Sequence, residues 1–314
     1  MKILFTGASS FTGFWFVKTL VAAGHQMICP LRGAVEKYDG VRRQRVEQLQ
    51  AACHFLPSAP FGSENFLKLA RQEKFDLLCH HAAEVTDYKS PSFDAMSALA
   101  GNVLHLRAVL KTLDCPVVLT GSVFENDEGA DPQQGKTKGK TEGEGLRAFS
   151  PYGLSKGMTF QYFRHYCHEA GVPLGKFVIP NPFGPFEEPR FTAHLMRHWR
   201  EGKTAEVKTP DYLRDNIHVD LLAAVYVLFA KRVAAMKSGG TKINPSGYAE
   251  KQGEFAKRVA REVEERMGWK CELKLAKQED FSEPMNRVNT EPASELVPKW
   301  NEAKAWDGFV DFYT

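Results

Sequence analysis

Short apolar runs alternate with helix-length segments through the first half of this 314-residue chain, and this alternation constrains the fold most strongly. The runs predict strands at Lys2–Thr6, Gln26–Leu31, Asp76–His80 and Pro116–Thr120, with weaker candidates near Cys53–Leu56 and at Leu174–Ile179. The intervening segments predict helices at Phe11–Ala23, Glu64–Gln72, Phe93–Leu113 and Tyr152–Ala170. Continuously apolar strands separated by helices indicate a parallel sheet covered on both faces. We therefore expect an α/β protein with a doubly wound sheet that binds its ligand at the carboxyl ends of the strands.

The second half is more irregular. Proline is more frequent after Pro180, and helical patterns return at Arg190–Glu201, His218–Lys231 and Glu250–Met267 and near the last residues. We expect residues 1–180 to form the doubly wound domain. Residues 181–314 are predicted to form a smaller substrate-binding part, with some strands and helices returning to the first domain.

One segment interrupts this pattern. Asn126–Ala148 alternates glycine with charged residues and has almost no apolar side chains, so it is predicted to be a long mobile loop. Long loops inside compact domains are often covers of active sites, but a tolerated surface insertion explains the composition equally well.

The composition excludes several partners. A formal net charge of +3 is too small to indicate binding to nucleic acid or to an anionic membrane. No stretch approaches the roughly 20 apolar residues of a membrane-spanning helix. The first apolar run begins directly after Met1, which favours a core strand over a secretory signal. The six cysteines are widely spaced, so we expect free thiols, no metal site and a cytoplasmic protein.

A glycine turn follows the first predicted strand and opens the first helix. It comprises Gly7, Ser9, Ser10, Phe11, Thr12 and Gly13. Gly7 would permit the tight turn, and Gly13 would let the helix approach the strand closely. The free N–H groups of a helix N-terminus bind phosphate, so this turn predicts a site for a dinucleotide pyrophosphate. A simple strand-to-helix turn is the alternative.

The end of the second strand bears on the choice of dinucleotide. NAD-binding proteins usually carry Asp or Glu there, since a carboxylate accepts a hydrogen bond from the ribose 2′-hydroxyl. This chain has Arg32 instead, with Arg42, Arg43 and Arg45 nearby in sequence. An arginine can pair with a 2′-phosphate, so the charge pattern favours NADP over NAD. An ordinary solvated arginine is the alternative.

Tyr152 and Lys156 lie four residues apart at the start of a predicted helix, which places both side chains on one face. An ammonium near a phenol favours the phenolate and lowers its pKa, so the tyrosine can exchange a proton with a substrate hydroxyl. Thr120 ends the strand before this helix, and its hydroxyl can bond the reacting oxygen. Ser122, two residues further on, can point the same way.

Together these motifs resemble the extended short-chain dehydrogenase/reductase family, the NAD-dependent epimerase/dehydratase group. The resemblance covers nearly the whole chain and rests on the order of six motifs. These are Thr6–Gly13, Phe75-Asp76 with His80-His81-Ala82-Ala83, Thr120 with Val123-Phe124, Tyr152 with Lys156, Asn181-Pro182-Phe183-Gly184-Pro185, and Arg214-Asp215-Asn216-Ile217-His218-Val219-Asp220. The fold it implies is a Rossmann-type doubly wound parallel sheet with a smaller C-terminal substrate-binding part.

The resemblance also implies roles. Tyr152 would be the catalytic acid/base, Lys156 would hold the nicotinamide ribose, and Thr120 would orient the substrate. The cofactor site would be completed by His81, Ala82, Ala83 and Asn102. The substrate site would include Ser122, Asn181, Arg190, Arg214 and Arg287, with Asn181 and the last two arginines at a diphosphate. For Arg214, a structural ion pair with Asp215 or Asp220 is the alternative.

Departures from the family pattern narrow the activity. Gly121 and Ser122 stand where the family's dehydratases carry an acidic pair, which counts against dehydration. Ser10 replaces the middle glycine of the cofactor turn. The resemblance therefore implies a nucleotide-sugar epimerase or reductase that transfers hydride at a hexose carbon, C4, with NADP or NAD.

Two other functions remain open: an NADP-dependent carbonyl reductase of a non-nucleotide substrate, and a non-catalytic NADP-sensing protein. The resemblance further implies a homodimer, joined through the helices near Phe93–Leu113 and Tyr152–Ala170.

Overall fold

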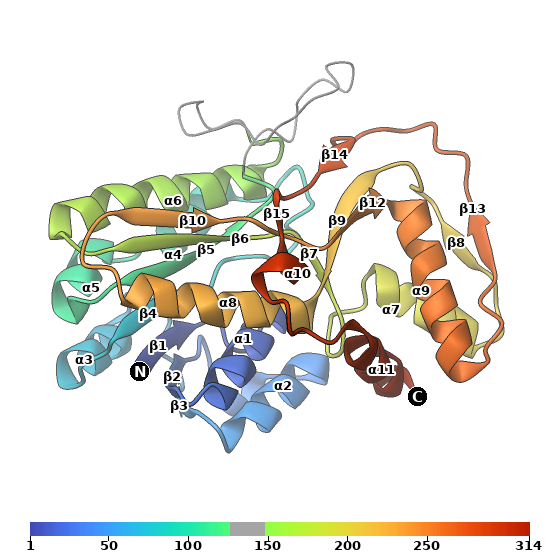
Figure 1. Ribbon diagram of the computed structural model, residues 1–314. Helices are drawn as coiled ribbons and strands as arrows, with labels where there is room; N and C mark the ends of the chain where they lie inside the picture. Colours follow the sequence, from blue (N-terminus) through green and yellow to red (C-terminus); the bar gives the residue numbers. More distant parts are fainter. Residues whose placement is uncertain (126–147) are drawn as a thin grey trace.

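The computed structural model describes residues 1–125 and 148–314, and most of the predicted glycine-rich loop, residues 126–147, lies outside them. Seven parallel strands form the central sheet, in the order β3-β2-β1-β4-β5-β6-β10 (Figure 1). Their bounds are β1 Lys2–Thr6, β2 Gln26–Pro30, β3 His54–Leu56, β4 Leu77–His80, β5 Val117–Ser122, β6 Leu174–Ile179 and β10 Gly240–Ile243. The predicted doubly wound fold is confirmed.

Helices cover both faces of this sheet because the strands are apolar on both sides. One face carries α1 (Phe11–Ala22), α2 (Gly40–Gln50) and α8 (Val219–Ala234), whose apolar side chains share one core cluster with the strands (Figure 1). The other face carries α3 (Glu64–Gln72), α5 (Leu106–Leu113) and α6 (Pro151–Ala170) around a second cluster. The winding reverses between β1 and β4, so their carboxyl ends flank the crevice where ligands bind in such sheets.

The predicted helix Phe93–Leu113 is wrong in one respect, because the structure divides it into α4 (Ala95–Asn102) and α5. His105 between them has a left-handed backbone (φ 49°), and its ring bonds the Gly62 carbonyl. The polar helix α2 was not predicted, since only Arg45, Val46 and Leu49 of it are buried.

The C-terminal part packs beside the carboxyl edge of the large sheet. A four-stranded sheet combines β7 (Asn181–Phe183), β9 (Leu213–His218), β12 (Tyr248–Lys251) and β14 (Asn286–Arg287), and β8 (Ala205–Val207) pairs with β13 (Leu273–Leu275). Helices α7 (Phe191–Arg200), α9 (Gln252–Met267) and α11 (Glu302–Tyr313) enclose a third apolar cluster (Figure 1). Short elements complete the chain: η1 (Val35–Lys37), β11 (Pro245–Ser246), β15 (Glu291–Pro292) and α10 (Ala293–Leu296).

None of the helices within the described ranges is long and apolar enough to cross a membrane. All six cysteines fall in these ranges and are unbridged, and five of them are buried. Across residues 1–125 and 148–314, no three His, Cys, Asp or Glu side chains are grouped to hold a metal ion.

Candidate active site

The glycine turn forms a close-packed cradle at the carboxyl end of β1. Gly7 has a φ of +85°, and a Cβ on it would lie 2.8 Å from the Ala82 backbone nitrogen. A Cβ on Gly13 would lie 2.1 Å from the Gly7 carbonyl oxygen. Ser10 caps α1: its hydroxyl donates to the Gly7 carbonyl at 2.8 Å and accepts from the Gly13 N–H at 3.1 Å. The cradle and the free end of α1 fit a dinucleotide pyrophosphate.

His81 connects this cradle to Thr120. Its Nε2 lies 3.0 Å from the Ser10 hydroxyl and 3.1 Å from that of Thr12, and its Nδ1 lies 3.0 Å from the Thr120 hydroxyl. Burial lowers the pKa of His81 to about 3, so the ring is neutral. Because the Ser10 proton goes to Gly7, Nε2–H is the donor and Nδ1 accepts the Thr120 proton.

Tyr152 and Lys156 do share one face of α6, at the carboxyl end of β5. The Lys156 ammonium donates to the Thr120 carbonyl at 2.6 Å. Burial lowers the pKa of Lys156 to about 8, against the opposing effect of the Glu125 carboxylate. Burial also raises the pKa of Tyr152, as do Glu125 and Tyr88, whereas Arg190 and a hydrogen bond with Ser122 lower it. The phenol is therefore protonated at neutral pH.

Ser122, and not Thr120, is the hydroxyl that meets Tyr152. Thr120 is buried and its proton is committed to His81, whereas Ser122 is partly exposed and lowers the pKa of the phenol. The two residues differ because β5 continues to Ser122. Two further residues advance the chain by about 6–7 Å, which carries Ser122 out of the core to the edge of the sheet.

Aromatic rings surround the phenol. Tyr88, Phe93 and Phe124 each contact the Tyr152 ring edge-on, at centroid distances of 5.3, 5.8 and 5.8 Å. The Arg190 guanidinium lies 5.9 Å from the Tyr88 ring, and that of Arg287 lies 4.3 Å from Phe124. Two cations thus lie one ring away from the candidate acid/base.

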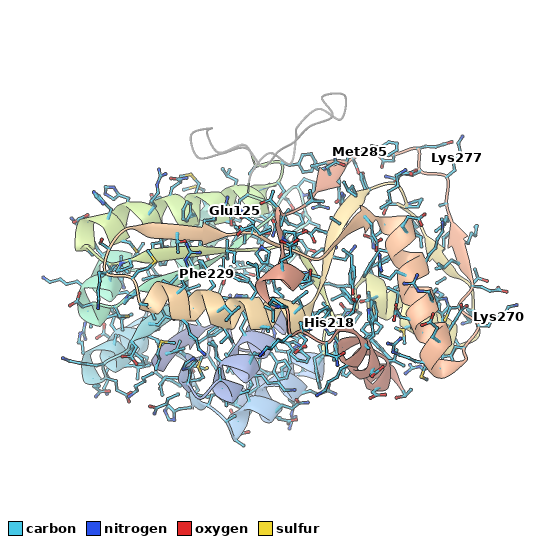
Figure 2. The ribbon with its side chains drawn as sticks, viewed as in Figure 1. Glu125, His218, Phe229, Lys270, Lys277 and Met285 are labelled. Carbon is cyan, nitrogen blue, oxygen red and sulfur yellow. The ribbon has the colours of Figure 1, made fainter. Side chains whose placement is uncertain are left out.

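Sequence reasoning missed a buried ion pair behind these residues. The Glu125 carboxylate lies 2.5 Å from the Lys176 ammonium, and their side chains are only 2% and 5% exposed. Glu125 also accepts from the Ser122 N–H at 2.7 Å and so fixes the turn that presents the Ser122 hydroxyl. Glu125 lies at the end of the parallel sheet (Figure 2). A charged residue inside a predicted parallel strand, such as Lys176, was the available signal.

Arg45 does not lie with Arg32, although its position in the sequence had suggested that both could face a 2′-phosphate. Its side chain is 0% exposed. It donates to the carbonyls of Ser9 at 3.1 Å and Phe186 at 2.9 Å and pairs with Glu188 at 2.8 Å. Arg45 therefore ties the cofactor turn to the segment that follows β7, while Arg32 stays 67% exposed and pairs with Glu84.

The two predicted diphosphate arginines do converge. Arg214 on β9 and Arg287 on β14 lie on paired strands, and both donate to the same oxygen of Glu283. Arg214 also donates to the carbonyls of Leu213, Pro284 and Met285. Asp215 instead accepts from the Gly247 and Asn289 backbones. The ion pair of Arg214 is thus with Glu283, outside its own motif.

The other predicted residues have partners of their own away from Tyr152. Asn181 on β7 bonds Asn216 at 3.0 Å. Asn102 is buried, and its amide donates to Thr159 while its carbonyl meets His80. Asn102 therefore braces α4 against α6 in this structure. The Ala82 N–H donates to Thr6 beside the cradle, and Ala83 follows it.

Comparison with known proteins identifies the family of this chain. Residues 3–244 match the model of the NAD dependent epimerase/dehydratase family. The chain belongs to this family. It is accordingly a nicotinamide-dependent enzyme of the extended short-chain dehydrogenase/reductase type, as the motifs predicted.

Similar solved structures are nucleotide-sugar epimerases. A variant of UDP-glucuronic acid 4-epimerase from Bacillus cereus, bound to NAD and a fluorinated UDP-sugar, has a TM-score of 0.76 at 16% identity, over 100% of this chain and 99% of that one. UDP-glucose-4-epimerase from Stenotrophomonas maltophila, with NAD and formylated UDP-arabinopyranose, has a TM-score of 0.75 at 16% identity, over 100% and 98%. UDP-N-acetylglucosamine 4-epimerase from Methanobrevibacter ruminantium M1 has a TM-score of 0.73 at 13% identity, over 99% and 97%. At these identities the likeness establishes the fold.

Proposed function

We propose that this protein is a nucleotide-sugar epimerase or reductase that transfers hydride at the C4 carbon of a hexose, with Tyr152 as the acid/base. The observation that carries this proposal is the arrangement of a protonated phenol and two guanidinium groups in one site. Phe124 contacts both the Tyr152 ring and the Arg287 guanidinium. A ligand that joins a sugar to a diphosphate can place its sugar at the Tyr152 phenol and its phosphates at the guanidinium groups. The UDP-sugars bound to the similar epimerases have this chemistry.

The proton step follows from the contacts of Tyr152. In the reducing direction, the phenol gives its proton to the carbonyl oxygen that becomes the C4 hydroxyl, and in the oxidising direction it takes the proton back. Ser122 holds the same oxygen by a hydrogen bond, since its own N–H is fixed by Glu125. The Lys156 ammonium stabilises the phenolate that the transfer leaves. A bound nicotinamide supplies or accepts the hydride.

The cofactor would lie across the carboxyl ends of β1 and β4. Gly7, Ser9, Ser10, Phe11, Thr12 and Gly13 would hold the pyrophosphate, with His81, Ala82 and Ala83 on the opposite wall. Lys156 would meet the nicotinamide ribose. We propose NADP as the preferred form, because the exposed Arg32 stands at the end of β2 where a 2′-phosphate would lie.

The substrate would lie between the aromatic rings around Tyr152 and the C-terminal part. We assign Arg214, Arg287 and Asn181 to the diphosphate, and Arg190 to the sugar side. A second candidate, an NADP-dependent reductase of a non-nucleotide carbonyl compound, is favoured by one observation: Glu283 already pairs with both arginines.

We also propose a homodimer through α4 and α6. These helices contact each other, and their outer surfaces expose Met96, Leu154 and Tyr162 at 74%, 44% and 39%. Exposed apolar side chains gathered on two adjacent helices are typical of interfaces. Sedimentation at micromolar concentration should give twice the 35.3 kDa chain mass.

A ligand screen tests the assignment. The purified chain is mixed with NADP or NAD and with UDP-, GDP-, CDP- or dTDP-sugars, and both thermal stabilisation and turnover are measured. A ligand at 100 times its Kd adds about 2.7 kcal/mol of stability, which is readily visible. Stabilisation and turnover by one nucleotide sugar are expected. Turnover of simple ketones or aldehydes without response to any nucleotide sugar would replace the proposal by the second candidate.

A further inference from the structure

Glu283 holds the position between two buried guanidinium groups. Arg214 and Arg287 both donate to its Oε2, the former at 3.2 Å. The arginine side chains are 8% and 9% exposed, whereas the Glu283 side chain is 35% exposed. Burial and, after it, the charge of Arg287 lower the pKa of Arg214, whereas Glu283 raises it. An anion between them is therefore required, and Glu283 supplies it.

The arginines and the carboxylate differ in how firmly they are held. Arg214 is fixed by three backbone carbonyls and lies 4.2 Å from the Tyr212 ring, and Arg287 stacks on Phe124. Glu283 belongs to a connecting segment outside regular structure and is anchored through its backbone N–H, which donates to the Tyr212 hydroxyl at 2.9 Å. Its side chain can leave while the cations stay in place.

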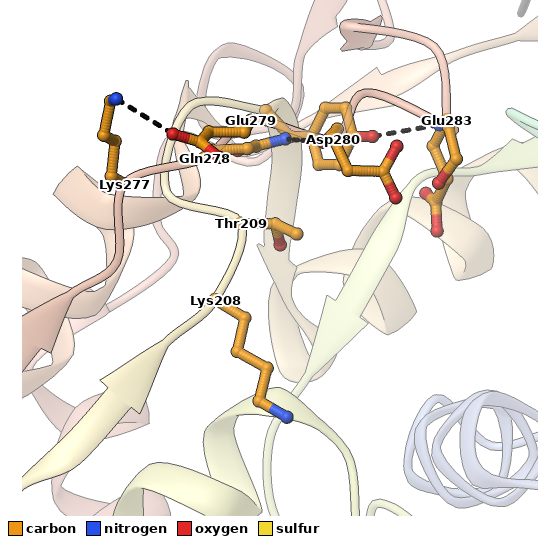
Figure 3. A pocket seen from close by; sticks show the side chains of 9 residues that line it. Lys208, Thr209, Lys277, Gln278, Glu279, Asp280 and Glu283 are labelled. Atoms are coloured by element: carbon orange, nitrogen blue, oxygen red, sulfur yellow. Dashed lines mark hydrogen bonds and ion pairs between the residues drawn. The ribbon is translucent and has the colours of Figure 1, made fainter.

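A neighbouring hollow gives the side chain a place to go. The cavity has a volume of about 250 Å³, and Glu283 lies on its wall together with Lys208, Tyr212 and the segment from Lys277 (Figure 3). The hollow is lined by charged and polar side chains of both signs, Lys208, Lys277, Gln278, Glu279 and Asp280 among them, so a carboxylate turned toward it remains solvated.

We infer that Glu283 is an internal substitute for a phosphate group, which the diphosphate of the substrate displaces from Arg214 and Arg287. This inference rests on the proposed nucleotide-sugar function and adds an affinity-setting residue to it. Displacement exchanges one anion for another at the same two donors, so Glu283 weakens binding of every nucleotide diphosphate. When no substrate is present, Glu283 compensates one of the two positive charges of Arg214 and Arg287. Small uncharged carbonyl compounds gain nothing from its removal.

The decisive variant is Glu283→Gln, which keeps the shape and removes the charge. Binding of UDP, UDP-glucose and inorganic pyrophosphate is measured by calorimetry on the full chain with cofactor present. Glu283→Gln should bind each of them about tenfold more tightly, which corresponds to about 1.4 kcal/mol. Its binding should also depend more steeply on salt, because two uncompensated cations then face the ligand. Asp307→Asn, which removes a carboxylate from Arg266 on α9, is the matched control and should bind as the wild type does.

The outcomes separate this inference from the proposed function. If the wild type binds the ligands and Glu283→Gln binds them equally or more weakly, the inference is overturned and the proposed function stands. This result is expected if the Glu283 carboxylate instead binds the ribose hydroxyls of the nucleotide. If Glu283→Gln binds UDP, UDP-glucose or pyrophosphate and the wild type binds none of them, the inference is supported. Absence of binding by both proteins would overturn the inference together with the diphosphate part of the proposed function.

Discussion

The two ends of the candidate site both contain buried charges, but they hold them differently. At the reaction end, Glu125 and Lys176 lie on β5's terminal turn and on β6, inside the large sheet, and are almost fully enclosed. At the anion end, Arg214 and Arg287 lie on the small sheet, and their partner Glu283 is one-third exposed on a connecting segment. The first pair is permanent and the second is exchangeable.

The difference follows from what each end has to do. Proton transfer requires fixed positions and a fixed field, which an enclosed ion pair provides at the cost of desolvating two charges. Recognition of a charged ligand requires donors that become available when the ligand arrives. Substitutions at the reaction end are therefore expected to have the largest effects, and a substitution outside both ends the smallest.

The largest effect is expected from Tyr152→Phe. Loss of the phenolic proton should reduce kcat by about 10²- to 10⁴-fold, since that is the usual contribution of an acid/base group. Cofactor affinity, measured by fluorescence titration, should change little. Tyr162→Phe on the exposed face of the same helix is the control and should keep full activity. Near-normal turnover by the Tyr152 variant would remove the acid/base assignment.

Lys176→Met should destabilise the protein strongly, because Glu125 is left charged and buried without a partner. The expected loss is about 3–5 kcal/mol in the free energy of unfolding, measured by urea denaturation. The double variant Glu125→Gln with Lys176→Met should recover most of it, because neither charge is then buried. If the single and double variants are equally unstable, the two residues do not act as a pair.

Glu125→Gln should alter the pH dependence of turnover. Lys156 must be protonated to stabilise the phenolate, and burial lowers its pKa to about 8 despite the Glu125 carboxylate, so wild-type activity should fall as pH rises through about 8. Removing that carboxylate lowers the pKa further, which moves the alkaline limit to lower pH. His80, His81 and Lys176 also act electrostatically on this ammonium and are retained in the variant. Because Lys176 loses its ion-pair partner, the pH profile is measured at a temperature at which the variant is folded. An alkaline limit that stays in place would restrict Glu125 to a structural role.

The smallest effect is expected at Arg32, which lies outside both ends. Arg32→Ser should reduce the preference for NADPH over NADH about five- to tenfold, since an exposed charge pair contributes only about 1 kcal/mol. The change should appear in the Kd for NADPH and leave that for NADH nearly constant. Equal loss for both cofactors would mean that Arg32 supports the cofactor site only through Glu84.

The sequence predicted the sheet better than its periphery, for a physical reason. Buried parallel strands are mostly apolar, and β1, β2, β4 and β5 are visible as such runs. The short strand β10, with Lys242 in its middle, and the polar helix α2 lack this signal. The break before α5 depends on a bond between His105 and Gly62, which are 43 residues apart.

The sequence by itself determined the fold class, the order of the motifs and the four-residue spacing that brings Tyr152 and Lys156 together, because these depend on local periodicity. Only the tertiary structure decided that the Thr120 hydroxyl bonds His81, which follows a different strand. It likewise decided that Arg45 is a buried brace and that Glu283 bridges Arg214 and Arg287. The ion-pair partners Arg287 and Glu283 are 4 residues apart, and Arg45 and Glu188 are 143 apart. Such pairs form only when the two parts of the chain have packed together, so local sequence patterns do not reveal them.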